Sequence, residues 1–185
     1  MPEEPSIVTS ETPDLNTHRS TAREKLLEHV FIADVLQEAW FGHGRTVEVL
    51  RAEVDDGGYD LVLACGPSIR WIQLKASQLG GKTTRQPISL RLADKPGACV
   101  VWVVFEPLAA TRRAGLSYLW FGGAPNDPLP SLGETVAQRP GTKKMRTGHR
   151  VLRRGQFESV GTTAELLGRL FGELSSRQRV EPDDR

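Results

Sequence analysis

The chain has 185 residues, of which 38% are hydrophobic and 25% are charged, and its formal net charge is +1. This length predicts one domain large enough to bury its own core, and the near-neutral charge does not by itself indicate a nucleic-acid partner. The longest apolar run, 98–105, is too short to cross a bilayer, and the N-terminus has no secretory-signal pattern, so we expect a cytoplasmic protein without a membrane partner. Cys65 and Cys99 form no CxxC pair, which argues against a zinc site and for two buried thiols in a reducing compartment.

Both ends of the chain are polar. Residues 1–18 are rich in Pro, Ser, Thr and Glu, and 176–185 have a similar character. Because such segments bury too little apolar surface to fold, we expect disordered tails at both ends. Residues 19–175 are then predicted to form a single domain.

The first predicted element is a helix at 21–40. Thr21 and Glu24 have the spacing of a capping box, and the glycines of "FGHG" end the helix. Apolar residues recur every four positions and form one stripe, and Glu28 falls inside that stripe. The members of the stripe are Leu27, Phe31, Val35 and Ala39.

A run of strands follows the helix. "DDGG" and "GPS" are turn signals, and the continuous apolar run "CVVWVVFE" is typical of a central strand buried on both faces. This order predicts an α/β fold, with a central mixed sheet of four or more strands flanked by helices. The predicted segments are strands at 45–54, 59–65 and 69–76, a strand or short helix at 88–93, strands at 99–106 and 116–123, a Pro/Gly-rich stretch at 122–148 and an amphipathic helix at 162–174.

The strand "IRWIQLKA" carries polar side chains where a buried strand should be apolar. Side chains alternate between the two faces of a strand, so Ile72, Leu74 and Ala76 form the core face. Gln73 and Lys75 share the other face with Trp71. A buried unpaired lysine costs several kcal/mol, so we expect a carboxylate partner or a wet cleft.

Two carboxylates are placed to meet this lysine. Asp60 opens the neighbouring hairpin strand, and Glu28 lies on the helix face that packs against the sheet. Carboxylates hold hard divalent cations such as Mg²⁺ or Mn²⁺, and the Gln73 amide oxygen adds a neutral ligand. Such a cation activates water and neutralises a phosphodiester, while Lys75 orients or deprotonates the water or stabilises the transition state.

The spacing Asp60-x12-Gln73-Leu74-Lys75, with a preceding helix that bears Glu28, resembles the core of the PD-(D/E)XK nuclease superfamily. It is most similar to variants with Gln at the middle acidic position, as in Mrr-like and Holliday-junction-resolvase-like relatives. The resemblance covers about 24–77 and the strand at 99–105. It implies a restriction-endonuclease-like fold in αβββαβ order, with Asp60 and Gln73 as metal ligands, Lys75 as catalytic residue and Glu28 as auxiliary ligand.

The sequence departs from the superfamily pattern at two positions. Tyr59 stands where a proline precedes the first aspartate, which matters little. Gln73 replaces a charged ligand, so we expect a lower affinity for the metal. Glu24 competes with Glu28 for the helix position, but its place in the capping box already explains it, so we prefer Glu28.

Other readings of the same residues remain open. Asp60 could end a turn, and Gln73 with Lys75 could form the solvated face of an edge strand. "GGKTT" lacks the first glycine of a P-loop and a following helix pattern, so we do not expect nucleotide binding there.

The segment 139–154 is basic and contains no acid, which predicts contacts with nucleic-acid phosphates. The alternative is a solvated, flexible loop. Lys82 and Arg85, in an earlier polar loop, are further candidates. The predicted contacts within the basic segment are Lys143, Lys144, Arg146, Arg150, Arg153 and Arg154.

The sequence thus predicts a metal-dependent nuclease that acts on DNA in defence, repair or mobile-element biology. Many folds of this kind act as dimers, so a homodimer is a further expectation. The alternative function is a decayed nuclease fold that binds nucleic acid or protein without cutting. A weaker alternative is a structural or regulatory protein with no nucleic-acid role.

Overall fold

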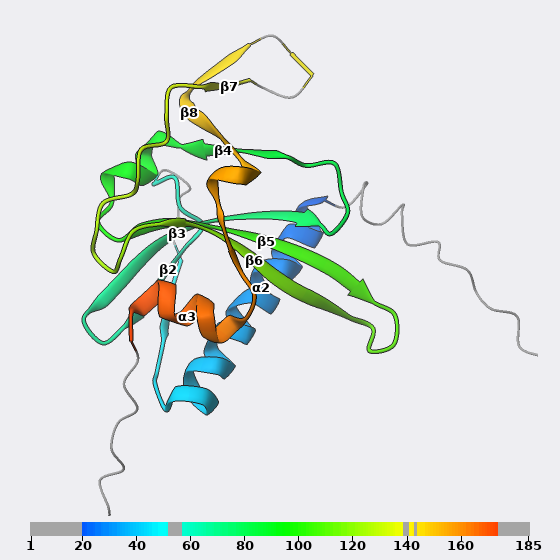
Figure 1. The fold of residues 1–185 in the computed structure, drawn as a ribbon, viewed down its shortest axis with the longest axis vertical. Coiled ribbons are helices and arrows are strands. Elements are labelled where there is room, and N and C mark those ends of the chain that lie inside the picture. Colours follow the sequence, from blue (N-terminus) through cyan, green and yellow to red (C-terminus); the bar gives the residue numbers. More distant parts are fainter. Residues whose placement is uncertain (1–19, 52–56, 139–140, 143, 174–185) are drawn as a thin grey trace, which may run out of the picture.

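A computed structural model describes residues 20–51, 57–138, 141–142 and 144–173. The tails predicted at 1–18 and 176–185 lie outside the described residues. Figure 1 shows a central sheet with two helices on one side and a smaller sheet on the other. In chain order the elements are α2 (Ser20–Gln37), η1 (Glu38–Gly42), β1 (Glu48–Leu50), β2 (Leu61–Cys65), β3 (Ser68–Gln78), β4 (Arg85–Ser89), η2 (Leu90–Asp94), β5 (Ala98–Leu108), β6 (Arg113–Gly122), β7 (Val136–Gln138), β8 (Met145–Arg153), η3 (Arg154–Gln156), β9 (Glu158–Val160) and α3 (Thr163–Phe171).

The central sheet has six strands in the order β1-β2-β3-β5-β6-β9. β3 and β5 are parallel and the other neighbours are antiparallel, so the predicted mixed sheet is confirmed. The run 98–105 is buried throughout in β5, as its unbroken apolar pattern predicted. Cys65 and Cys99 are buried free thiols, and burial raises the pKa of Cys99 to about 12.

The smaller sheet has three strands in the order β4-β8-β7, and the sequence did not predict it. The Pro/Gly-rich stretch 122–148 contains β7, and the basic segment 139–154, for which a flexible loop was the alternative reading, contains β8. The ambiguous segment 88–93 combines the end of β4 with the 3-10 helix η2. The crossover from β3 to its parallel neighbour β5 therefore runs through β4 and η2 within the described residues, instead of through the α-helix that the resemblance implies.

Each face of the central sheet carries its own core. On one face Ile72 and its neighbours pack with the apolar sides of α2 and α3. On the other face Trp102 packs with residues of β4, η2 and β8. Ile72 and Leu74 belong to the first core, as predicted, and Trp71 on the opposite face of β3 packs against the second core.

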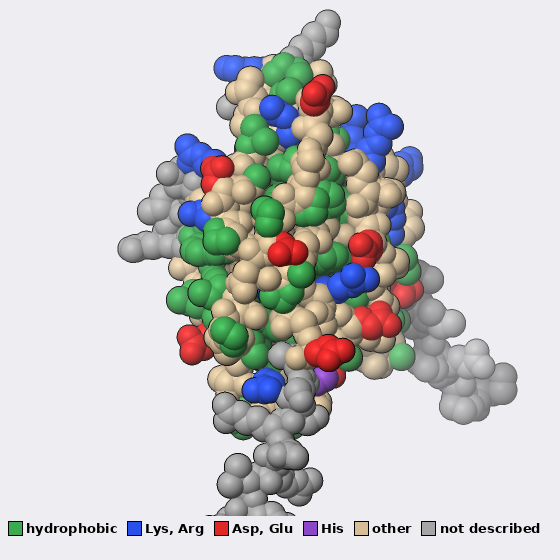
Figure 2. Space-filling model, turned by 60° about the vertical axis from the view of Figure 1, so that its left-hand side comes forward, with side chains coloured by type: hydrophobic (Ala, Val, Ile, Leu, Met, Phe, Trp, Pro, Cys, Tyr) green, Lys and Arg blue, Asp and Glu red, His purple; other side chains and the backbone are tan. Residues whose placement is uncertain are grey.

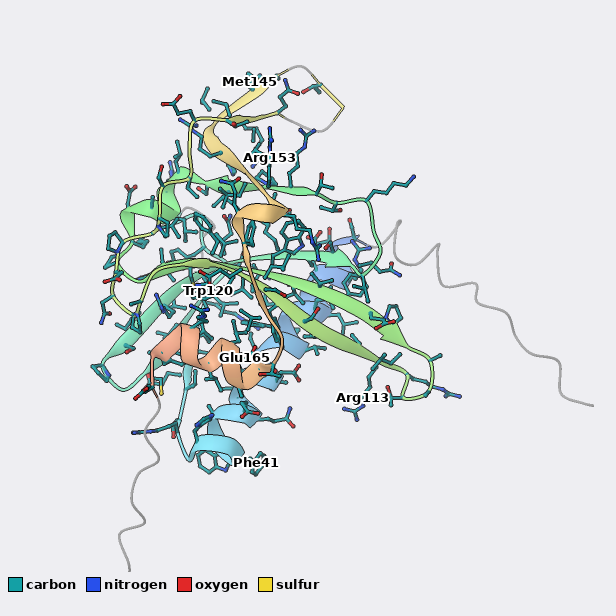
Figure 3. All side chains as sticks on the ribbon, in the orientation of Figure 1. Phe41, Arg113, Trp120, Met145, Arg153 and Glu165 are labelled. Atoms are coloured by element: carbon teal, nitrogen blue, oxygen red, sulfur yellow. The ribbon has the colours of Figure 1, made fainter. Side chains whose placement is uncertain are left out.

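The helix ends follow local chemistry. The Thr162 hydroxyl accepts a hydrogen bond from the Glu165 backbone N–H at 3.1 Å, so the predicted cap of α3 is confirmed. α2 continues as the π-helix η1, which leaves Trp40 and Phe41 exposed at its far end (Figure 3). Neither described α-helix has the length and apolar character of a membrane-spanning segment.

Candidate active site

The hairpin of β2 and β3 places Asp60 beside the polar face of β3. The Asp60 backbone N–H donates to the Ile72 carbonyl at 2.8 Å, which extends the ladder by one residue. The Asp60 Oδ2 atom accepts from the Leu74 backbone N–H at 2.6 Å. Leu74 lies between Gln73 and Lys75, so the carboxylate is fixed next to both.

The segment before Asp60 is held by close packing. Gly58 has a φ of 72°, and a Cβ atom there would lie 2.5 Å from the Ser89 hydroxyl oxygen, so only glycine fits. Tyr59 packs edge-on against Trp71, with ring centroids 4.7 Å apart. Tyr59 therefore anchors the position that a proline occupies in the superfamily pattern.

Glu28 reaches the same region from α2. It is buried, as its place in the apolar stripe predicted, with 7% of its surface exposed. Its Oε2 atom lies 2.9 Å from Lys25 Nζ and its Oε1 atom lies 3.2 Å from Arg51 Nη2. The Arg51 contact lacks hydrogen-bond geometry, so the buried Oε1 atom accepts no hydrogen bond from the described residues.

Gln73 is buried, and its amide oxygen accepts a hydrogen bond. Its Oε1 atom accepts from the Ser89 backbone N–H at 3.1 Å. A carbonyl oxygen has a second lone pair, so this hydrogen bond is compatible with metal ligation but restricts its direction. Gln73 also ties β3 to the start of η2 and thereby to the smaller sheet.

Two adjoining pockets share Asp60 and Lys75. The first, which we call the carboxylate pocket, has a volume of about 320 Å³, and α2 supplies Glu24 and Glu28 to its wall. The second, which we call the arginine pocket, has a volume of about 430 Å³ and lies between the two sheets. The charged or polar side chains that line it are Asp60, Gln73, Lys75, Ser89, Arg91, Arg146 and His149.

The structure therefore brings Glu28, Asp60 and Lys75 to one pocket and places Gln73 in the adjoining one. Glu24 is exposed on the rim of the carboxylate pocket, whereas Glu28 is buried in it. This difference favours Glu28 over Glu24 as the helix carboxylate, because a buried carboxylate is the more rigid one.

These residues fit a hard cation of the Mg²⁺ class. Mg²⁺ commonly binds one or two carboxylates and completes its octahedron with water and substrate phosphate. Asp60 and Glu28 supply that number, and the buried Oε1 atom of Glu28 lacks a hydrogen-bond donor. Among the described residues, no three His, Cys, Asp or Glu side chains stand close enough to enclose a metal by themselves. The site thus fits a cation that depends on water and substrate for its remaining ligands.

The predicted phosphate contacts separate into groups. Lys82, Arg85, Arg153 and Arg154 line one open hollow at the junction of β4 and β8, which we call the outer hollow. Arg146 lines the arginine pocket instead. Lys144 is exposed, and Lys143 lies outside the described residues.

Positive charge gathers over the smaller sheet. On the face shown in Figure 2, Lys and Arg side chains are more frequent over the upper part, where β8 and β7 lie, and Asp and Glu are more frequent below. Figure 3 labels Met145 and Arg153 at the two ends of β8. Met145–Arg153 of the basic segment thus form β8 of the smaller sheet.

Sequence reasoning missed Arg91 and His149 as residues of the site. Arg91 stands in the segment that was read as strand or short helix, and His149 was not among the predicted phosphate contacts of the basic segment. Their position depends on η2 and on the pairing of β8 with β4, which is long-range in the sequence. The one local signal was the cluster of Arg146, His149 and Arg150 inside the basic segment.

Function has to be inferred from this geometry. The chain was compared with protein-family models and with curated proteins, and neither comparison found a match.

Proposed function

We propose that the chain is a divalent-metal-dependent nuclease that hydrolyses phosphodiester bonds of DNA, with a restriction-endonuclease-like fold. The observation that carries the proposal is the pair of pockets that share Asp60 and Lys75. One pocket offers carboxylates to a cation, and the other offers arginines to an anion. Metal-assisted hydrolysis of a phosphodiester uses a cation to activate water and fixed donors to stabilise the charge that develops on the phosphoryl oxygens.

The residues of the two pockets have separate roles in this reaction. Asp60 and Glu28 would hold the cation, which supplies water activation and charge neutralisation when bound. Lys75 donates a hydrogen bond to the attacking water or to the phosphoryl oxygen that gains charge. The water oxygen bonds to phosphorus, the bond to the leaving oxygen breaks, and a proton passes to that oxygen.

Asp60→Asn is expected to abolish cleavage of plasmid DNA while leaving the fold intact. The amide oxygen of asparagine still accepts the hydrogen bond from Leu74, but the cation loses its anionic ligand. A cation contributes several kcal/mol and about 1.4 kcal/mol is a factor of ten, so we expect a loss of at least about a hundredfold. The measurement is plasmid nicking at matched protein concentration with Mg²⁺ or Mn²⁺.

The matched control is Asp94→Asn, which removes an exposed carboxylate at the end of η2. It should cut as well as wild type. If wild-type protein cleaves and Asp60→Asn cleaves equally well, the proposed metal site is wrong.

A second candidate function is nucleic-acid binding by the same fold without cleavage. It is favoured because two of the predicted metal ligands already have partners within the protein. Glu28 is paired with Lys25 and Arg51, and Gln73 accepts a hydrogen bond. This function predicts DNA binding that weakens with salt and no cleavage with any divalent metal. The same assay, run beside a binding titration, separates the two functions.

Arg153→Gln is expected to weaken DNA binding and to preserve or raise stability. Arg85 and Arg153 face each other across the antiparallel pair of β4 and β8, and like charges in that position are destabilising by about 0.2–1 kcal/mol. Losing one phosphate contact should reduce the slope of log K against log salt by about one. Fluorescence anisotropy over a salt series and urea denaturation measure the two effects.

The control is Arg113→Gln, at the exposed start of β6 (Figure 3). An unchanged salt slope for Arg153→Gln would place the DNA elsewhere than the outer hollow.

A further inference from the structure

The arginine pocket has a feature that a plain basic surface lacks, which is a bulge in β8. Val136 and Ala137 are adjacent in β7, but they pair with Arg150 and Arg146 of β8. Residues 147–149 of β8 therefore have no pairing partner in β7. Bulges re-aim side chains and are frequent beside active sites.

This bulge brings two side chains of one strand together. Arg146 and His149 are three residues apart, so they would point to opposite faces of a regular strand. Instead Arg146 Nη2 lies 2.9 Å from His149 Nε2. A guanidinium can only donate, so a hydrogen bond between these two atoms has Nε2 as its acceptor. Both side chains are half-buried.

The Arg150 side chain stabilises the bulge through hydrogen bonds to the backbone of its own strand. Its Nη1 atom donates to the Thr147 carbonyl at 2.8 Å and to the His149 carbonyl at 3.3 Å. Arg150, which was predicted as a phosphate contact, thus uses its Nη1 atom on the backbone of the bulge. The bulge is therefore a fixed feature, and it fixes the Arg146–His149 pair.

The charges around the pocket favour an anion. The titratable side chains on its wall are Lys75 from β3, Arg91 from η2, Arg146 and His149 from β8, and the single acid Asp60. Arg146 donates one N–H group to His149. Its guanidinium has further N–H groups in the same plane, and two of these can bind two oxygens of a phosphate. Gly148, on the same wall, adds no side chain to the space.

We propose that the arginine pocket binds the reacting phosphodiester, that Arg146 contacts it as a catalytic residue, and that His149 is the positioning residue that orients Arg146. The identity of the reacting group rests on the proposed function. Arg85 and Arg153, in the outer hollow, then contact phosphates away from the reaction, so the smaller sheet serves both chemistry and binding.

The kinetic test compares variants of the two groups in single-turnover cleavage of plasmid DNA. Arg146→Ala should lower kcat by about 10²–10³-fold, the usual cost of one donor to a developing charge. His149→Ala should lower kcat by about tenfold, and His149→Gln should recover most of that loss because its amide oxygen accepts from Arg146. Arg153→Gln should raise KM instead, and Arg113→Ala should match wild type. Equal kcat for wild type and Arg146→Ala would overturn the catalytic role.

A second test needs no cleavage, so it separates this inference from the proposed function. The dinucleotide d(TpT) is titrated without metal while the side-chain NMR signals of Arg146 and His149 are followed. Shifts of both signals in wild type, with the His149 shift abolished in Arg146→Ala but kept in Arg153→Gln, support the pocket even if wild type cuts no DNA. Signals that stay unmoved at saturating d(TpT), or an unchanged titration of Arg146→Ala, overturn it even if wild type cleaves.

Discussion

Lys75→Ala is expected to lower kcat for DNA cleavage by about 10²–10⁴-fold and to change DNA affinity little. Lys75 lines both pockets, so its ammonium group stands where the cation and the phosphate would meet. A positioned group of this kind contributes in the transition state, where charge develops on the phosphoryl oxygens, more than in the ground state. Binding energy from the outer hollow is unaffected by the change. Single-turnover cleavage and metal-free anisotropy measure the two quantities separately.

The comparison variants sharpen this experiment. Lys75→Arg keeps the charge but replaces a compact ammonium with a planar fork, so we expect partial activity. Lys95→Met is the matched control, because Lys95 is also half-buried, its Nζ atom lies 5.1 Å from the Trp71 ring centroid, and it lines neither pocket. Equal cleavage by wild type and Lys75→Ala, with Asp60→Asn inactive, would remove the role of the lysine and keep the metal site.

The parts of the fold that were predictable are those with strong local patterns. The apolar stripe of α2, the turn between β2 and β3, the unbroken apolar run of β5 and the cap of α3 each signal their own element. β8 gives no such signal, because its basic residues face outward or line pockets. Its pairing with β4 and β7 makes it a strand, and that pairing is set by tertiary packing.

The same distinction applies to the candidate site. Asp60, Gln73 and Lys75 lie on one hairpin, so alternation and turn position were enough to place them together. Glu28 followed from the helical wheel. The contributions of Arg91 and His149 depend on η2, on the β8 bulge and on contacts between two sheets. No spacing within the chain encodes these, since a bulge is defined by the strand that it faces.

Arg70 is expected to be the most sensitive position for stability, because the alternation of "IRWIQLKA" places it on the same face of β3 as Ile72 and Leu74. Its side chain is fully buried in β3, with 0% exposed, and stacks over the Trp120 ring at 5.3 Å from the centroid (Figure 3 labels Trp120 between the sheet and α3). Burial lowers the pKa of its guanidinium. The group donates to five backbone carbonyls, those of Gly97, Gly123, Ala124, Arg169 and Leu170.

These contacts join three separate parts of the fold. Arg169 and Leu170 belong to the last turn of α3, where carbonyls have no partner within the helix and carry the negative end of its dipole. Arg70 donates to these carbonyls and also to carbonyls in the loop before β5 and in the loop after β6. A guanidinium uses five N–H groups in a fixed plane, which no other side chain offers. Arg70 thus locks α3 onto the strand that carries Gln73 and Lys75.

Arg70→Met should lower the free energy of unfolding by about 3–5 kcal/mol, because several buried carbonyls lose their donor at once. For a chain of this size that corresponds to a fall in Tm of roughly 10 °C. Arg70→Lys should fall between methionine and wild type, since an ammonium has three donors and no fork. Arg113→Met, on the exposed start of β6, should change the free energy of unfolding by less than about 0.5 kcal/mol. Urea denaturation measures all three, and a loss for Arg70→Met as small as that for Arg113→Met would show that water replaces the guanidinium without cost.

If Arg70→Lys remains folded, it should keep Lys75-dependent cleavage, because Arg70 stabilises β3 at its opposite end and touches neither pocket.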